Sequence, residues 1–228
     1  MKLFKDYKNY WDYMQPYRSA VNLVKAKLEG IDDELKCEHG YSPIHQIQSR
    51  IKSLESIEEK IERKHYSNTL DSLKKLYDIA GLRVICHYIN DIQYISQLFI
   101  MHEDIHLLKT VNYIDYPKES GYQSLHLVVE VSIYCQNGLM KIPVEIQLRT
   151  IAMDCWASLE HDLLYKNKRA ISKDIQDELK ECAKRIALTD LQMQRIYQKV
   201  YQEKRKRRNN HQSNEKCYQI YNFIILVK

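Results

Sequence analysis

The 228-residue sequence predicts an α+β fold, in which a mixed central β-sheet is flanked by helices and extended by helical segments at both ends. Three patterns support this prediction. Apolar and polar residues alternate over residues 125–133 and again over 141–149, as in the two strands of a hairpin. Residues 82–89 form a compact apolar run that is typical of a central strand, and apolar residues recur at helical spacing over residues 17–35.

The first elements of the chain are predicted to be two helices. One is expected from Tyr17 to about Leu35, with Pro16 tolerated at its first turn. The break at residues 40–43 ends this pattern, and Ser53 is expected to be the N-cap of the second helix. The buried side of that second helix is expected to carry Leu54, Ile57 and Ile61.

Strands and one helix are predicted to alternate in the middle of the chain. After the strand at 82–89, Asn90 or Asp91 is expected to cap a helix that continues to about Met101. A second strand is expected over residues 106–116.

The clearest β pattern follows a segment with loop chemistry at 118–122. Gln136-Asn137-Gly138 supplies a hairpin turn between the two alternating strands. In the return strand, Ile142, Val144, Ile146 and Leu148 point one way, whereas Lys141, Glu145, Gln147 and Arg149 point the other way.

Two amphipathic helices, about 150–166 and 173–205, are expected to complete the fold, the second with Ile175, Leu179, Cys182, Ile186 and Met193 as its apolar positions. We divide the chain into an N-terminal helical region (1–45), a core (46–166), a C-terminal helix (167–208) and a tail (209–228).

The composition indicates a soluble cytoplasmic protein that favours polyanionic ligands. Hydrophobic residues make up 44% and charged residues 29% of the chain, and the net charge is +5. No apolar run approaches the roughly 20 residues that span a bilayer, and the first residues lack the apolar core of a signal peptide. The six cysteines form no C-x-x-C pair and are expected to be reduced core residues.

The polar face of the return strand carries Glu145, Gln147 and Arg149 side by side. Such a row is either the solvated side of a half-buried strand or a group that binds a metal, a base edge and a phosphate in a cleft. Tyr122 and His126 have the matching parity on the partner strand side, so a hairpin would bring them near the same face.

An acidic residue and a basic set precede these strands. Asp78 lies just before the strand at 82–89, where it would either cap a turn or join a second carboxylate in a Mg²⁺ site. The cationic residues are either solvated surface charges or ligands of a triphosphate. They are Arg50, Lys52, Lys60 and Arg63.

One motif suggests a different chemistry. The segment from His102 to His106 fits the H-E-x-x-H pattern of zinc peptidases, which needs both histidines on one helix face. A helix is expected to end near Met101 and a strand to begin at His106, so we do not expect a zinc site. The chain also has no P-loop motif.

Four segments together resemble the RelA/SpoT-type alarmone synthetase domain. Asp78-Ile79-Ala80-Gly81-Leu82-Arg83, Lys118-Glu119-Ser120-Gly121-Tyr122-Gln123-Ser124-Leu125-His126 and Val144-Glu145-Ile146-Gln147-Leu148-Arg149-Thr150 are similar to its three signature blocks, and Trp156-Ala157-Ser158-Leu159-Glu160-His161-Asp162 to the segment after them. The resemblance extends over about residues 11–205. It implies a nucleotidyltransferase-like fold in a stand-alone synthetase, without a hydrolase or regulatory domain, and a homo-oligomer that is often a tetramer.

The resemblance implies Mg²⁺-dependent transfer of diphosphate from ATP to the ribose 3′-hydroxyl of GTP, GDP or GMP, giving AMP and a (p)ppGpp-type alarmone. It assigns the metal and the catalysis to Asp78 and Glu145, with Glu145 taking the hydroxyl proton. It assigns ATP to Arg50 and Arg83, which would enclose the adenine, and to Lys52, Lys60 and Arg63, which would hold the phosphates. It assigns the acceptor nucleotide to Lys118, Tyr122, His126 and Gln147, with Tyr122 stacked on guanine.

Two alternatives remain at this stage. Relatives of this kind include toxins that pyrophosphorylate the 3′ end of tRNA, so the acceptor itself could differ. The run Lys204-Arg205-Lys206-Arg207-Arg208 would also suit RNA binding. An RNA-binding module that uses no nucleotide has no use for the paired acids Asp78 and Glu145. We rank RNA binding as an added property.

Overall fold

The computed structural model describes residues 7–67, 69–136, 138–166 and 172–209. One compact unit extends to Asp190 and a second unit begins at Leu191, within the last helix. The described helices are α1 (Tyr7–His39), α2 (Leu54–Arg63), α3 (Leu70–Leu73), α4 (Ile89–Ile100), α5 (Ile151–Lys166) and α6 (Lys173–Asn209). The described strands are β1 (Ile44–Ile51), β2 (Ala80–Cys86), β3 (Ile105–Asn112), β4 (Leu125–Cys135) and β5 (Gly138–Thr150).

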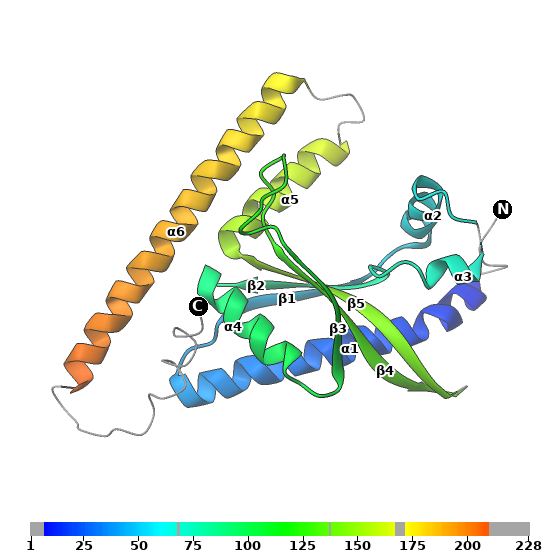
Figure 1. Cartoon of the computed structure of the whole chain (residues 1–228), viewed down its shortest axis with the longest axis horizontal. Helices are drawn as coiled ribbons and strands as arrows, with labels where there is room; N and C mark the ends of the chain where they lie inside the picture. Colours follow the sequence, from blue (N-terminus) through cyan, green and yellow to red (C-terminus); the bar gives the residue numbers. More distant parts are fainter. Residues whose placement is uncertain (1–6, 68, 137, 167–171, 210–228) are drawn as a thin grey trace. The chain divides into compact units, whose positions relative to one another are not determined.

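The strands form one mixed sheet, as predicted, and their order is β1-β2-β5-β4-β3 (Figure 1). β2 and β5 are parallel, whereas the other three neighbouring pairs are antiparallel. The fifth strand in the sequence therefore lies in the middle of the sheet, between β2 and β4.

Helices α1 and α4 pack on one face of the sheet (Figure 1). From β5, Val144, Ile146 and Leu148 point into this layer, and each is at most 1% exposed. The predicted alternation is therefore confirmed, and the residues between them lie on the opposite face. Burial of the apolar face drives the layers together, at roughly 25 cal/mol per Å² of apolar surface.

Helix α1 begins earlier than predicted, so that Pro16 lies inside the helix rather than at its first turn. Proline lacks an N–H group and removes one intrahelical hydrogen bond. The buried stripe nevertheless continues through Tyr10, Met14 and Tyr17 in line with the residues that follow. Packing of this stripe against the sheet compensates for the lost hydrogen bond.

Strand β1 was not predicted, because its apolar residues Ile44, Ile47 and Ile51 have the spacing of a helix. The register shifts between Ile44 and Gln46, which indicates a β-bulge. In a regular strand, two residues face the same side only if an even number of positions separates them. The extra residue of the bulge lets Ile44 and Ile47, three positions apart, face the same core.

Other boundaries differ by a few residues. The N-cap of α4 is Tyr88 rather than Asn90 or Asp91, and the Asp91 carboxylate accepts the Tyr88 N–H at 3.0 Å. β3 ends at Asn112 rather than Tyr116, because Oδ1 of Asn112 accepts the N–H groups of the next turn, 2.9 and 3.1 Å away. The Ser53 N-cap is confirmed: its side chain accepts the Ser56 N–H.

The last helix buries less than predicted. Ile175, Cys182 and Met193 on α6 are exposed, whereas Ala183 and Asp190 are buried. The expectation that the cysteines are core residues was wrong for Cys37, Cys155 and Cys182, which are exposed, and right for Cys86, which is buried.

Some predictions fall on residues that are not described. Asn137 of the predicted hairpin turn lies outside the described residues, although Gly138 beside it has φ +107° and pairs with Cys135. The side chains of residues 204–209 and all of residues 210–228 also lie outside the description. None of the described helices is long and apolar enough to cross a membrane.

Candidate functional site

The sheet face opposite α1 and α4 places the predicted residues in two adjacent rows. The strand register aligns Arg50, Gly81 and Glu145 in one row. The next row is formed by Gln48, Arg83, Gln147 and His126. Residues almost a hundred positions apart in the sequence thus become neighbours on one surface.

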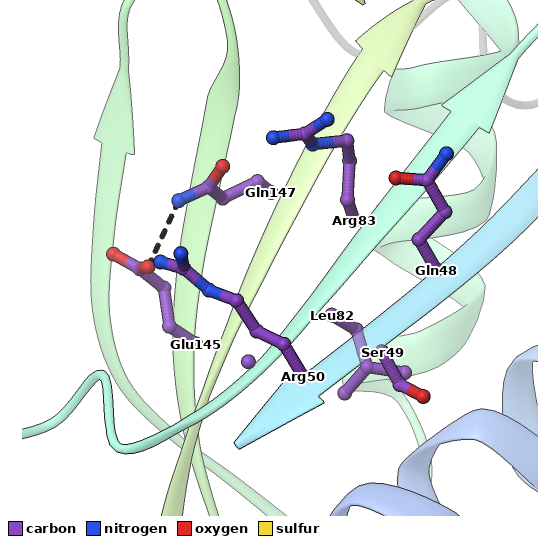
Figure 2. Close-up of a pocket in the computed structure, with 8 residues that line it drawn as sticks. Gln48, Ser49, Arg50, Leu82, Arg83, Glu145 and Gln147 are labelled. Carbon is purple, nitrogen blue, oxygen red and sulfur yellow. Dashed lines mark hydrogen bonds between the residues drawn. The ribbon is translucent and has the colours of Figure 1, made fainter. Parts of the chain in front are cut away.

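A pocket of about 120 Å³ opens over these rows. Figure 2 shows Arg50, Arg83, Glu145 and Gln147 rising from the strands around it. Gly81 lies between Arg50 and Glu145 in the first row, where a Cβ would be in ordinary contact with the Arg50 side chain, 3.8 Å away. The complete lining is Gln48, Ser49, Arg50, Gly81, Leu82, Arg83, Glu145 and Gln147.

Asp78 lies just before β2 and is held by two ammonium groups. Its Oδ2 accepts hydrogen bonds from Lys52 at 2.7 Å and from Lys60 at 2.5 Å. Burial raises the pKa of Asp78, but the hydrogen bonds and charges of the two lysines outweigh burial and leave the pKa lowered. Its Oδ1 is buried and has no hydrogen-bond partner among the described residues.

Glu145 is held on both carboxylate oxygens. Oε2 accepts the Nε2–H of Gln147 at 2.9 Å, and Oε1 lies 3.5 Å from Nδ1 of His126. Burial raises the pKa of Glu145 and the negative charge of Asp78 adds to this, but the contacts with His126 and Gln147 lower it overall. Glu145 is therefore ionised at neutral pH, and it is near enough to Asp78 for the two charges to interact.

An aromatic group lies beside Glu145. The ring centroids of Tyr113, Tyr122 and His126 are 5.3–5.9 Å apart in edge-to-face arrangements. The ammonium of Lys118 lies 4.6 Å from the centre of the Tyr122 ring and 4.8 Å from that of Tyr113. Lys118, Tyr122 and His126 are therefore brought together, as the sequence led us to expect.

The loop that carries Tyr122 is braced by α6. Gly121 has φ +94°, and a Cβ at this position would lie 2.5 Å from Cβ of Ala183. Tyr122 packs against a small cluster of Trp156, Ala157 and Ala183. Only glycine fits this close approach, so α6 fixes the position of the loop.

The site includes three residues to which the resemblance assigned no role: Arg149, Asp154 and Tyr113. Arg149 is only 4% exposed, and its Nη1 donates to Oδ1 of Asp154 on the first turn of α5 at 3.2 Å; Nη1 of Arg83 forms an ion pair with the same oxygen at 3.2 Å. The alternation of the strand places Arg149 on the same polar face as Glu145. It does not predict that α5 lies over this face and buries the Arg149 side chain. Tyr113 carried no sequence signal of its own.

Other predicted residues stand apart. Arg63 lies in the last turn of α2 with an exposed side chain, whereas Lys60 of the same helix reaches Asp78. His102 follows α4 and His106 lies in β3, so the two histidines do not share a helix face. Within the described ranges, no group of three or more His, Cys, Asp or Glu side chains could hold a metal ion.

Comparison with known proteins gives a consistent result. Residues 49–170 match the family described as "Region found in RelA / SpoT proteins". The chain is 39% identical to GTP pyrophosphokinase YwaC of Bacillus subtilis over 199 residues, covering 87% of this chain and 93% of YwaC. It is 37% identical to GTP pyrophosphokinase YjbM of the same organism over 191 residues, covering 84% of this chain and 90% of YjbM.

Solved structures agree with these sequence matches. The crystal structure of small alarmone synthetase 1 from Bacillus subtilis bound to its product pppGpp has a TM-score of 0.79 and 36% identity, covering 85% of this chain and 98% of that one. Small alarmone synthetase 2 from the same organism has a TM-score of 0.76 and 37% identity, covering 83% and 98%. This chain belongs to the RelA/SpoT family.

Proposed function

We propose that this protein transfers diphosphate from ATP to the ribose 3′-hydroxyl of a guanine nucleotide, giving AMP and a (p)ppGpp-type alarmone. The observation that carries the proposal is the position of Glu145 and Asp78. Glu145 lines the pocket with the two arginines and contacts His126 of the aromatic group, and Asp78, held by two lysines, lies near enough for its charge to act on Glu145. The relatives named GTP pyrophosphokinase support the same reaction.

ATP would occupy the pocket and the lysines next to it. Arg50 and Arg83 both line the pocket, and guanidinium planes stack well on an adenine ring. Lys52 and Lys60 now hold Oδ2 of Asp78 and would turn to the phosphates of ATP. Arg63 is exposed beyond them and would reach the end of the triphosphate chain.

The acceptor nucleotide would lie on the other side of Glu145. A guanine base stacked on Tyr122 must displace one of the cations over that ring. Lys118 is the one to move, because its side chain is exposed, whereas Arg149 is buried and hydrogen-bonded. The freed ammonium would then hold the acceptor phosphates, with His126 and Gln147 contacting the ribose side.

Mg²⁺ fits the donor set at this site. Mg²⁺ is usually bound by one or two carboxylates together with substrate phosphate oxygens. Oδ1 of Asp78 is a buried oxygen without a partner among the described residues, and Glu145 offers the second carboxylate. When bound, the ion would neutralise charge on the transferred diphosphate.

The protein's own residues would perform the remaining steps. Glu145 is ionised and takes the proton of the 3′-hydroxyl as this oxygen attacks the β-phosphorus of ATP and AMP leaves. A positioned base contributes about 10²–10⁴ in rate. The arginine and lysine side chains align the donor for in-line attack and stabilise the charge that develops.

One experiment tests the proposal. Purified protein is incubated with Mg²⁺, labelled ATP and, separately, GTP, GDP, GMP or tRNA, and the products are separated by chromatography. Formation of AMP together with a guanine nucleotide that carries an added 3′-diphosphate supports the proposal. Labelled tRNA would favour the toxin reaction, and absence of AMP with every acceptor would exclude diphosphate transfer. Salt-sensitive binding of RNA without turnover would support only the RNA-binding alternative.

We also infer that the protein is a homo-oligomer, with a tetramer favoured. The support is a set of exposed apolar residues on α6, a long helix that buries few of its side chains within the single chain. These residues are Leu188, Leu191, Met193, Ile196, Val200 and Tyr201.

A further inference from the structure

Arg149 is a buried charged residue beside Glu145 that the reaction above does not use. Its side chain comes from β5, on the same face as Glu145. Nη2 donates to the hydroxyl of Tyr122 and, at 2.9 Å, to Oε1 of Gln147. Nη1 donates to Asp154 at 3.2 Å, and the guanidinium lies 4.9 Å from the centre of the Tyr122 ring.

The contact with Gln147 sets the direction of its amide. A guanidinium has donors only, so the amide oxygen of Gln147 must face Arg149. The amide nitrogen then points the other way, and its N–H donates to Oε2 of Glu145 at 2.9 Å. The ionised carboxylate of Glu145 offers only acceptors and favours the same direction of the amide, so Arg149 and Glu145 together fix Gln147 between them.

The contact with Tyr122 sets the tautomer of His126 in the same way. Because the hydroxyl oxygen of Tyr122 accepts from Arg149, its own proton is available for Nε2 of His126, 2.9 Å away. In the neutral imidazole the proton must then be on Nδ1, which faces Oε1 of Glu145 at 3.5 Å. This last separation is too long to fix the tautomer alone.

We propose that Arg149 is a positioning residue that orients two hydrogen-bond arms onto the two oxygens of Glu145, one through Gln147 and one through Tyr122 and His126. The inference rests on the proposed function only in taking Glu145 as the base. The two arms hold the carboxylate plane, so that a free electron pair is directed at the acceptor hydroxyl.

Asp154 anchors this arrangement. Its Oδ1 also forms an ion pair with Arg83, which lines the donor pocket. The shared carboxylate holds the two guanidinium groups close to each other. The pKa of Arg83 is lowered, first by burial and next by the charge of Arg149. Arg149 is thus held at one end by α5 and directs its other donors along the sheet.

Lysine cannot replace arginine here, which gives the test. Arg149→Lys keeps the positive charge but lacks the planar fork whose Nη1 donates to Asp154 while Nη2 donates to Tyr122 and Gln147. We expect kcat to fall by about ten- to a hundredfold with the KM for ATP within about twofold. In ¹⁵N NMR spectra of histidine-labelled protein, His126 should change from the Nδ1–H to the Nε2–H tautomer, with His126→Gln assigning the signal.

Lys141→Gln is the matched control, since Lys141 lies exposed on the same face of β5. It should leave both the tautomer and kcat unchanged. If folded Arg149→Lys keeps the Nδ1–H tautomer and nearly full kcat, the inference is wrong. The tautomer can be read without turnover, so its outcome stands even if the diphosphate transfer fails.

A second variant serves if Arg149→Lys does not fold, as judged by circular dichroism. Tyr122→Phe removes only the hydroxyl that joins Arg149 to His126 and leaves the Gln147 arm intact. It should produce the same tautomer change. A folded Tyr122→Phe protein in which His126 keeps its proton on Nδ1 would refute the relay.

Discussion

At the scale of single residues, the site combines groups that sequence patterns reveal with groups they do not. Glu145 could be predicted for two reasons. The alternation of its strand places it on the polar face, and the segment 144–150 resembles a signature block of the family. The partnership of Lys52 and Lys60 with Asp78 was not predicted, since it depends on how α2 lies beside β2. The contacts of Asp154 with Arg149 and Arg83 were not predicted either, because a helix brings Asp154 to the sheet from outside the strand pattern.

Replacing Glu145 by glutamine should separate binding from chemistry. Glutamine keeps the size of the side chain and can still contact Gln147, but it cannot take up the hydroxyl proton. We expect turnover to fall at least about a hundredfold, with folding and ATP binding close to those of the wild type. Steady-state AMP formation and equilibrium ATP binding measure the two effects.

Glu130→Gln is the control for this change, because Glu130 is on the same face of the sheet and pairs with Lys141 away from the pocket. It should retain normal turnover. More than a tenth of wild-type activity in Glu145→Gln would show that Glu145 is not the base.

At the scale of elements, periodicity predicted most helices and strands, and local packing decided where it failed. β1 escaped because a bulge gives its isoleucines helical spacing. The start of α1 was misplaced because Pro16 resembles a helix start, whereas burial of Tyr10 and Met14 extends the helix beyond it. Neither a bulge nor long-range burial is visible in a single sequence.

The contact between Gly121 and α6 should govern acceptor binding. In Gly121→Ala the new methyl group would meet Cβ of Ala183 at 2.5 Å, so the loop must move away from α6 and take Tyr122 with it. We expect the KM for the acceptor to rise about tenfold, while that for ATP changes little. Initial-rate kinetics with each substrate varied in turn measure this.

Gly138→Ala distinguishes crowding from backbone strain. Gly138 also has a positive φ, of +107°, but a Cβ there would meet nothing within 4 Å. This variant should lose some stability and keep its acceptor KM. Equal effects of the two substitutions on KM would argue against a role for the α6 contact.

The start of α4 should make folding stability depend on pH. Burial raises the pKa of Asp91 to about 6, against the opposing hydrogen bonds from Tyr41 and Tyr88 and the charge of His87, while Asp32 adds to the rise. An acid with a raised pKa in the folded state favours folding at low pH, and this contribution is lost as the pH rises from about 4 through 6. Asp91→Asn removes that dependence.

The stability of Asp91→Asn relative to wild type should therefore improve by about 2–3 kcal/mol between about pH 4 and about pH 8. Urea denaturation at each pH gives both free energies of unfolding. A difference that does not vary with pH would show that Asp91 keeps its ordinary pKa in the folded protein.

At the scale of the whole molecule, the fold class and the grouping of the site residues could be predicted, but the surroundings of α6 could not. Its apolar positions suggested a buried helix, yet many of them are exposed in the single chain. Sequence periodicity reports that a face is apolar and does not report whether the same chain or another copy covers it.

The inferred oligomer can be tested on that helix. Leu188 is 67% exposed, so its replacement by lysine costs little within one chain but would place a charge in an interface. Light scattering after gel filtration should show a smaller mass for Leu188→Lys than for wild type. Lys199→Gln on the same helix should keep the wild-type mass, and a monomeric wild type would remove the inference.

The central place of β5 has a consequence for synthesis on the ribosome. β1 and β2 can pair early, and β3 and β4 can pair later, but these two halves have no direct contact in the sheet until β5 lies between them. A nascent chain that ends before β5 begins at Gly138 therefore exposes two unfinished apolar edges and holds only Asp78 of the two acids. Aggregation during translation should be greatest in that interval, and it should end when β5 leaves the exit tunnel.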